Sequence, residues 1–149
     1  MDRARKNQRI GRLLHEVTAL VDQAAERTLR EHSALTLSQF LLLLGVSEQD
    51  DAPTQQEIAV HLGIDRAAVS RQVARLEARG LFTRRREDGR SNALELTPAG
   101  QAELRRAQRA MEEHMTPHYT APRDPDALLE ALEAVRRSLL SASKGDQGR

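Results

Sequence analysis

The chain contains no cysteine and few aromatic residues. Without cysteine it can have no disulfide scaffold, no cysteine-ligated zinc or iron–sulfur centre, no thiol nucleophile and no thiol redox sensor. Only 2% of its residues are Phe, Tyr or Trp, which argues against a stacking platform for single-stranded nucleic acid. The longest apolar run, residues 40–45, is far below the ~20 residues that span a bilayer, and no signal-peptide core follows the first residues. We therefore expect a soluble cytoplasmic protein.

An excess of charge of one sign is also missing, because 23 basic residues nearly cancel 22 acidic ones and leave a net charge of +1. Taken alone, this balance argues against a generic polyanion binder. The charge is nevertheless segregated along the 149 residues, which are enough for one domain with a real core. Residues 1–12 and 65–90 each carry a net +4, whereas residues 47–64 hold four acids and neither Lys nor Arg.

The two ends of the chain predict amphipathic helices. In residues 8–31, apolar side chains recur at spacings of 3, 4, 3 and 4, which is typical of a seam that packs against another helix. A last helix follows the capping signal Asp124-Pro125 and carries a similar stripe that starts at Leu128, before a polar tail after Ser141. These stripes could belong to a monomer core, but their position at the two termini favours an interface between two copies.

The middle of the chain predicts a helix–turn–helix followed by a hairpin. Capping boxes at Thr36 and Thr54 start two short helices, and Asp65 caps a third that ends before Gly80. The helices on either side of residues 62–65 form the helix–turn–helix. Residues 81–84 and 92–96 read as strands around a charged turn at 87–91, and Thr97-Pro98 starts a charged helix that runs to about Met115.

The second helix of this motif has two contrasting faces. Val69, Val73 and Leu76 fall within about 60° on a helical wheel and should face the core. The opposite face holds only small residues and arginine: Ala67, Ser70, Arg71, Ala74, Arg75 and Ala78. Small side chains let the backbone approach a groove, and arginine can pair with guanine through two hydrogen bonds. A solvated face is the alternative, but such a face usually holds glutamates too, and Glu77 is the only acid after the cap.

Other basic and polar residues also favour duplex DNA. Arg84, Arg85 and Arg86 lead into the hairpin, and arginine on a protruding wing can enter the minor groove. Some of these three are expected to pair with the hairpin acids Glu87, Asp88 or Glu95. Donors at the start of the first helix of the motif, at Thr54 and Gln55, can hold a phosphate, and Arg66 on the flank of the second helix is expected to do the same.

Residues 35–107 resemble the MarR (multiple-antibiotic-resistance regulator) family of winged helix–turn–helix transcription factors. Short motifs in a fixed order carry the resemblance: Leu37-Ser38-Gln39-Phe40, Thr54-Gln55-Gln56-Glu57-Ile58-Ala59, Leu62-Gly63-Ile64-Asp65, Val69-Ser70-Arg71, Arg75-Leu76-Glu77-Ala78-Arg79-Gly80-Leu81, Arg84-Arg85-Arg86-Glu87-Asp88-Gly89-Arg90 and Leu96-Thr97-Pro98-Ala99-Gly100. The resemblance implies a homodimer held by the first and last helices, with residues 65–79 in the major groove. It also implies that Arg90 reaches the minor groove and that Asp88 helps to hold it. The predicted wing is short, and Gly89 directly precedes Arg90 in it.

The expected fold is mostly helical, a winged helix–turn–helix with a small β-hairpin wing and a helical dimerisation region from both termini. Its expected parts are a dimerisation helix (1–34), the DNA-binding lobe (35–100), C-terminal dimerisation helices (101–142) and a polar tail (143–149). The predicted DNA contacts are Thr54, Gln55, Arg66, Ala67, Ser70, Arg71, Arg75, Arg84, Arg86, Asp88 and Arg90.

The expected function is a non-enzymatic, sequence-specific repressor that acts as a homodimer on a pseudo-palindromic DNA operator, without a cofactor or a membrane partner. The resemblance implies an anionic or phenolic effector but does not identify it. A winged helix that binds proteins is the alternative, whereas no nucleophile–base–acid constellation favours an enzyme. His114 and His118 have metal-ligand spacing, but Thr116-Pro117 breaks the helix between them, so we predict no metal site.

Overall fold

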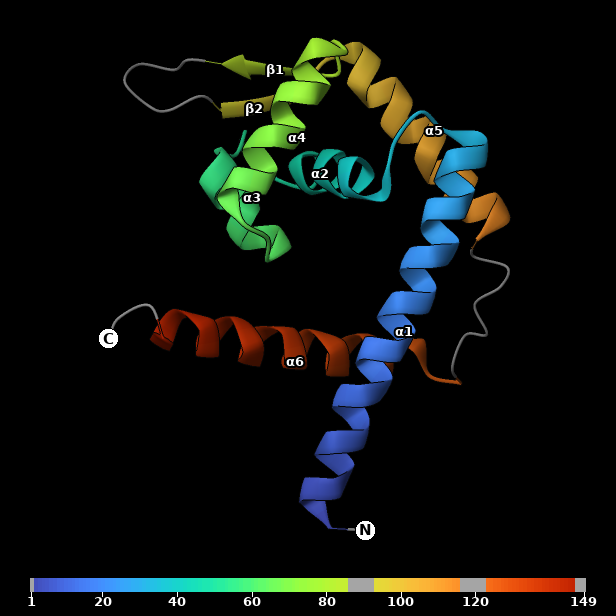
Figure 1. Ribbon diagram of the computed structural model, residues 1–149, viewed down its shortest axis with the longest axis vertical. Coiled ribbons are helices and arrows are strands. Elements are labelled where there is room, and N and C mark those ends of the chain that lie inside the picture. Colours follow the sequence, from blue (N-terminus) through green and yellow to red (C-terminus); the bar gives the residue numbers. More distant parts are fainter. Residues whose placement is uncertain (1, 86–92, 116–122, 147–149) are drawn as a thin grey trace. The chain divides into compact units, whose positions relative to one another are not determined.

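The structure, a computed structural model, describes residues 2–85, 93–115 and 123–146. These residues form six helices and one antiparallel pair of strands, which confirms the predicted fold class. In chain order the elements are α1 (Arg3–His32), α2 (Leu37–Ser47), α3 (Gln55–Leu62), α4 (Arg66–Ala78), β1 (Phe82–Arg85), β2 (Ala93–Leu96), α5 (Pro98–His114) and α6 (Pro125–Asp146) (Figure 1). The chain divides into two units, residues 1–117 and 118–149, so α6 lies in a unit of its own. In the described ranges no helix is long and apolar enough to cross a membrane.

Side-chain caps start the helices where the sequence predicts them. Thr36 and Thr54 form complete capping boxes, each with the Gln or Glu three residues later. The Asp65 carboxylate accepts a hydrogen bond from the amide of Ala68, and the Thr97 hydroxyl accepts one from the amide of Gly100. Each cap acts within three residues, which is why the sequence alone places these helix starts well.

Two helices are longer than their apolar stripes predict. Helix α1 begins at Arg3 instead of near residue 8, and α6 continues past Ser141 to Asp146. Apolar periodicity marks only the part of a helix that packs against a neighbour, whereas polar residues without proline can extend the helix beyond it.

The core of the first unit lies between α2, α3, α4 and the hairpin. Its fully buried side chains include Leu42 and Leu43 of α2, Ile58 of α3, and Leu94 of β2. The predicted inward face of α4 is confirmed, because all three of its apolar residues are completely buried: Val69, Val73 and Leu76. Burial of each such side chain contributes about 1.5–3 kcal/mol, so this face fixes the rotation of α4 about its own axis.

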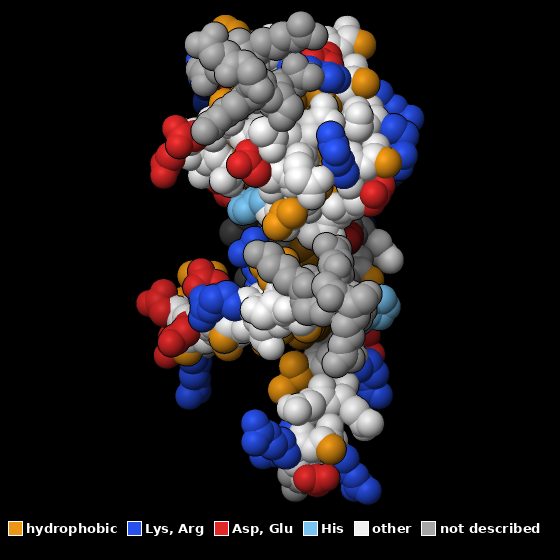
Figure 2. All heavy atoms as spheres, turned by 90° about the vertical axis from the view of Figure 1, so that its left-hand side faces the viewer, with side chains coloured by type: hydrophobic (Ala, Val, Ile, Leu, Met, Phe, Trp, Pro, Cys, Tyr) orange, Lys and Arg blue, Asp and Glu red, His pale blue; other side chains and the backbone are white. Residues whose placement is uncertain are grey.

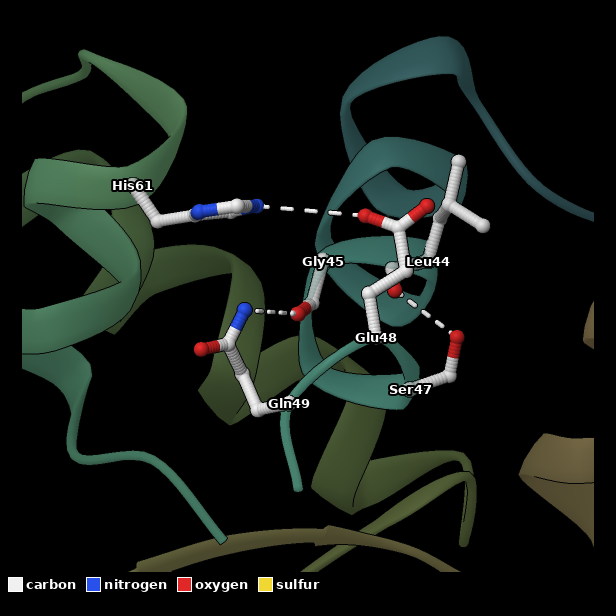
Figure 3. A network of polar contacts seen from close by, with 6 residues as sticks. All are labelled: Leu44, Gly45, Ser47, Glu48, Gln49 and His61. Atoms are coloured by element: carbon white, nitrogen blue, oxygen red, sulfur yellow. Dashed lines mark hydrogen bonds and ion pairs between the residues drawn. The ribbon is translucent and has the colours of Figure 1, made fainter. Parts of the chain in front are cut away.

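Helices α2 and α3 meet at a close junction (Figure 3). A Cβ atom built on Gly45 would lie 3.2 Å from Cδ2 of Leu62, so the missing side chain lets the two helices approach. Polar contacts finish the end of α2: Gln49 donates to the carbonyl of Gly45, and the imidazole of His61 lies 3.9 Å from the Glu48 carboxylate. Gly63 then ends α3 with φ of +65°, a conformation that glycine adopts without strain, and the chain turns into α4.

The hairpin is tied to the rest of the lobe at its base. Phe82 pairs with Leu96, and Arg85 pairs with Ala93. The amide of Leu94 donates to the carbonyl of Pro53 at 2.8 Å, which links β2 to the loop before α3. The amide of Thr97 donates to the carbonyl of Leu81 at 3.0 Å. Main-chain hydrogen bonds thus hold this two-stranded ribbon, which would be marginal alone.

The end of α1 packs against α5. Arg106 donates to the carbonyl of His32, and the Glu103 carboxylate accepts from the Ser33 hydroxyl. The rings of His32 and His114 stack with their centroids 3.8 Å apart, so this contact also joins the end of α1 to the end of α5. His118 lies outside the described residues, and the described part of the chain contains no cluster of three or more His, Asp or Glu suited to a metal ion.

Candidate nucleic-acid interface

Helix α4 (Figure 1) has one exposed face, opposite the face that packs on the core. Six residues of this face are exposed, as predicted: Ala67, Ser70, Arg71, Ala74, Arg75 and Ala78. The buried face opposite them holds α4 on the core, so the exposed face has a fixed orientation. A helix presented in this way, with short side chains between arginines, fits a DNA major groove.

The arginines around α4 fall into two groups. Arg66, Arg71 and Arg75 are exposed and make no ion pair with the acids that the structure describes. The second group is held by the protein itself. Arg79 donates to the side chain of Gln39 and to the carbonyl of Ala34, which ties the end of α4 to the segment before α2.

Arg84 and Arg85 also belong to the second group. The predicted pairing with hairpin acids is confirmed for Arg85, whose guanidinium lies 3.0 Å from the Glu95 carboxylate. Arg84 differs, because its guanidinium lies 2.7 Å from the carboxylate of Glu77 on α4. This contact requires β1 to fold back beside α4, so sequence spacing within the hairpin does not reveal it.

The start of α3 retains a donor for a phosphate. The capping box uses the amide of Thr54, which donates to the Glu57 carboxylate at 2.7 Å, and the hydroxyl oxygen of Thr54, which accepts from the amide of Glu57. The hydroxyl hydrogen is not part of this box. Thr54 and Gln55 are both half-buried, so a phosphate would meet them at the edge of the lobe. The other predicted contacts, Arg86, Asp88 and Arg90, lie outside the described residues.

Figure 2 shows the side of the molecule toward which the hairpin points. Basic and acidic side chains both occur on its upper lobe, so the surface is not uniformly positive. Within residues 65–90, three arginines on α4 are exposed and make no ion pair with a described acid: Arg66, Arg71 and Arg75. This pattern favours the reading of a specific site over general attraction to polyanions.

A cavity of about 530 Å³ opens on another side of the lobe, where the end of α2, strand β2 and α5 meet. Buried side chains of Val46, Leu94 and Leu104 contribute its apolar lining. Arg105 lies at its wall and has no ion-pair partner among the described residues. No short-range pattern in the sequence predicts this cavity, because its walls come from three separate segments.

Comparison with known proteins gives the context for this geometry. A sequence profile of the MarR family matches residues 35–91. A solved structure of a transcriptional repressor named CouR, bound to p-coumaroyl-CoA, is 31% identical in sequence, with a TM-score of 0.69, and the match covers 85% of this chain and 90% of that one. The chain belongs to the MarR family. It is a DNA-binding transcriptional regulator with a winged helix–turn–helix.

Other MarR-family structures agree in fold. A structure of CouR bound to a 23-mer DNA duplex is 28% identical, has a TM-score of 0.66 and matches over 100% of this chain and 99% of that one. The regulator BldR from Sulfolobus solfataricus has a TM-score of 0.82 at 21% identity, over 93% of this chain and 99% of that one, and supports the fold alone. A comparison with curated proteins finds no match.

Proposed function

We propose that this MarR-family chain is a repressor that acts as a homodimer, with one α4 in each of two successive major grooves of its operator. The exposed face of α4, with three guanidinium groups free of described acids, is the observation that carries the proposal. Two such helices require half-sites about 34–36 Å apart on one side of B-form DNA, in a pseudo-palindromic arrangement.

The proposed contacts divide by chemistry. Arg71 and Arg75, together with Ala67 and Ser70 on the same exposed face, contact the base edges. Arg66 and the start of α3 at Thr54 and Gln55 hold phosphates. The wing residues Arg86, Asp88 and Arg90 serve the minor groove, as the family resemblance implies. We assign residues 35–100 to DNA binding, residues 1–34 and 101–142 to dimerisation, and residues 143–149, which begin with the last turn of α6, to a polar tail. We propose no catalytic activity for the chain. We also propose that it is cytoplasmic, where a DNA-binding regulator meets its operator.

The experiment that tests the proposal is a titration of the dimer with duplexes selected from genomic fragments, at several salt concentrations. A regulator should bind its operator with steep salt dependence and prefer it over random duplex by a factor on the order of a thousand or more. A winged helix that binds only proteins should show neither result. Selection of the same short inverted repeat from many fragments would also give the operator sequence.

The homodimer is supported by apolar side chains that this chain leaves uncovered. In α1 the predicted seam is 43–66% exposed at Ile10, Leu13, Val17 and Leu20. The N-terminal part of α1 extends beyond the helices on which its C-terminal part packs, and Figure 2 shows hydrophobic side chains exposed along it. In α6 the stripe residues Leu128, Leu132 and Leu139 are exposed as well. Two uncovered stripes at helical spacing fit helix packing between subunits.

Introducing a charge into this seam should separate the subunits. We expect Val17→Glu to raise the dimer dissociation constant at least roughly tenfold, because a carboxylate would lose its hydration inside the interface. Sedimentation velocity over a concentration series measures this change. Gln8→Glu is the matched control, since Gln8 lies on α1 away from the stripe and is exposed. If Val17→Glu and Gln8→Glu have the same dimer dissociation constant, the apolar stripe of α1 is not the dimer interface.

The effector is proposed to bind in the cavity between α2, β2 and α5. Its apolar lining suits an aromatic or aliphatic group, and Arg105 suits an anion. CouR has been solved with p-coumaroyl-CoA, an aromatic thioester that carries phosphates, and this chemistry fits the same pattern. Since β2 forms one wall, a bound molecule would alter the position of the hairpin and shift the dimer away from the spacing that DNA requires.

Removing Arg105 should therefore desensitise the protein to an anionic effector. With p-coumaroyl-CoA and free p-coumarate as probes, Arg105→Ala is expected to bind operator normally but to need roughly tenfold more effector for release. Fluorescence anisotropy of labelled operator measures both quantities. Arg109→Ala, one turn further along α5 and outside the cavity lining, is the control. An unchanged effector response in Arg105→Ala would place the effector elsewhere.

A further inference from the structure

One ion pair connects the wing to α4. The Glu77 carboxylate lies 2.7 Å from Nη2 of Arg84, and the two side chains are only 28% and 31% exposed. The Nε atom of Arg84 is buried and has no hydrogen-bond partner among the described residues. Arg84 therefore points into the junction between β1 and α4, where water and a phosphate have limited access to it.

The neighbouring ion pair has a different geometry. Arg85 pairs with Glu95, which lies on β2 opposite Thr83, so this contact stays within the hairpin. It can stiffen the ribbon, but it does not set the angle between the ribbon and α4. The Glu77–Arg84 pair crosses from helix to strand, and Arg84 lies opposite the fully buried Leu94 in the sheet register.

We propose that Glu77 is a positioning residue for DNA binding. It holds the wing at a fixed angle to α4 through Arg84, and Arg84 acts through this pair instead of through a phosphate. The inference rests on the proposed binding of duplex DNA by α4 and the wing together. This role accounts for Glu77, the only acidic residue within α4.

Simple electrostatics predicts the opposite effect of removing this acid. Glu77→Gln deletes a negative charge beside a polyanion, which by itself should tighten binding. If the pair fixes the angle between the wing and α4, its removal should instead weaken binding, because a displaced wing no longer contacts the DNA while α4 lies in the major groove. The sign of the change therefore separates a positioning role from a general field effect.

The experiment is a double-mutant cycle on the full-length dimer with Glu77→Gln, Arg84→Gln and both together. Operator affinity is measured by anisotropy at three salt concentrations, and thermal unfolding checks that each variant is folded. Asp51→Asn is the control for field effects, since this exposed acid on the same lobe makes no ion pair with described residues. We expect all three variants of the cycle to bind roughly threefold to tenfold more weakly, with the double variant no worse than either single one.

Two outcomes would overturn the inference. If Glu77→Gln tightens binding as Asp51→Asn does, the pair has no positioning role. If Arg84→Gln weakens binding and lowers the salt slope by about one while Glu77→Gln has no such effect, Arg84 contacts a phosphate directly. A wild-type dimer without salt-dependent duplex binding would instead refute the proposed function, so the two failures are distinguishable.

Discussion

Gly100→Ala is expected to destabilise the winged-helix lobe by about 3 kcal/mol or more. A Cβ atom on Gly100 would lie 2.0 Å from the carbonyl oxygen of Leu81, far inside van der Waals contact. This oxygen belongs to the main chain and accepts a hydrogen bond from the amide of Thr97, so it cannot turn away without breaking the base of the wing. Urea denaturation followed by circular dichroism measures the change as a lower midpoint.

The chain provides a matched control for this substitution. Gly11 lies inside α1 with open space around its Cβ position, and its φ is not positive. Gly11→Ala should stabilise α1 by about 0.5–1 kcal/mol, because alanine loses less backbone entropy in a helix than glycine. Equal unfolding midpoints for the two variants would show that the contact between Gly100 of α5 and Leu81, the residue before β1, is not as close as the structure indicates.

Arg71→Ala is expected to reduce operator affinity by a factor of roughly five to a hundred while leaving binding to random duplex almost unchanged. The reason is that a bidentate contact with a base contributes about 1–3 kcal/mol of discrimination. Arg66→Ala should instead weaken all duplexes alike and lower the salt slope by about one, as expected for a phosphate contact. Anisotropy titrations with operator and scrambled duplexes at several salt concentrations distinguish the two patterns.

The pair of variants also tests the division of roles on α4. Both arginines are exposed and free of described acids, so they differ only in their position on the helix. If Arg71→Ala and Arg66→Ala change specificity and salt slope by the same amounts, the assignment of base and phosphate contacts is wrong, although α4 would still be the DNA-binding element.

The structure changes how the regional charge is interpreted. Residues 65–90 contain eight arginines, which the sequence presents as one basic region. Arg79, Arg84 and Arg85 are held by hydrogen bonds or ion pairs within the lobe. These three contribute to the architecture of the wing and the end of α4. In the described part of this region, Arg66, Arg71 and Arg75 are exposed and make no ion pair with a described acid.

Local features could be predicted from the sequence because their causes are local. A capping box joins residues three apart, and the faces of α4 follow from a period of 3.6 residues. The predicted starts of five helices, α2 to α6, and the buried and exposed sides of α4 are therefore confirmed. The apolar stripes did not predict where α1 begins and where α6 ends, because polar residues without proline can extend a helix beyond its apolar stripe.

By itself, the sequence determined the order of elements, the face that α4 presents and the absence of any thiol chemistry. Only the tertiary structure decided that Arg84 pairs with Glu77, that His32 stacks on His114, and that Gly100 contacts Leu81. The same holds for the cavity beside Arg105, whose walls come from α2, β2 and α5. Each of these contacts joins separate elements, and their distances depend on how the whole core packs, which no short-range pattern in the chain encodes.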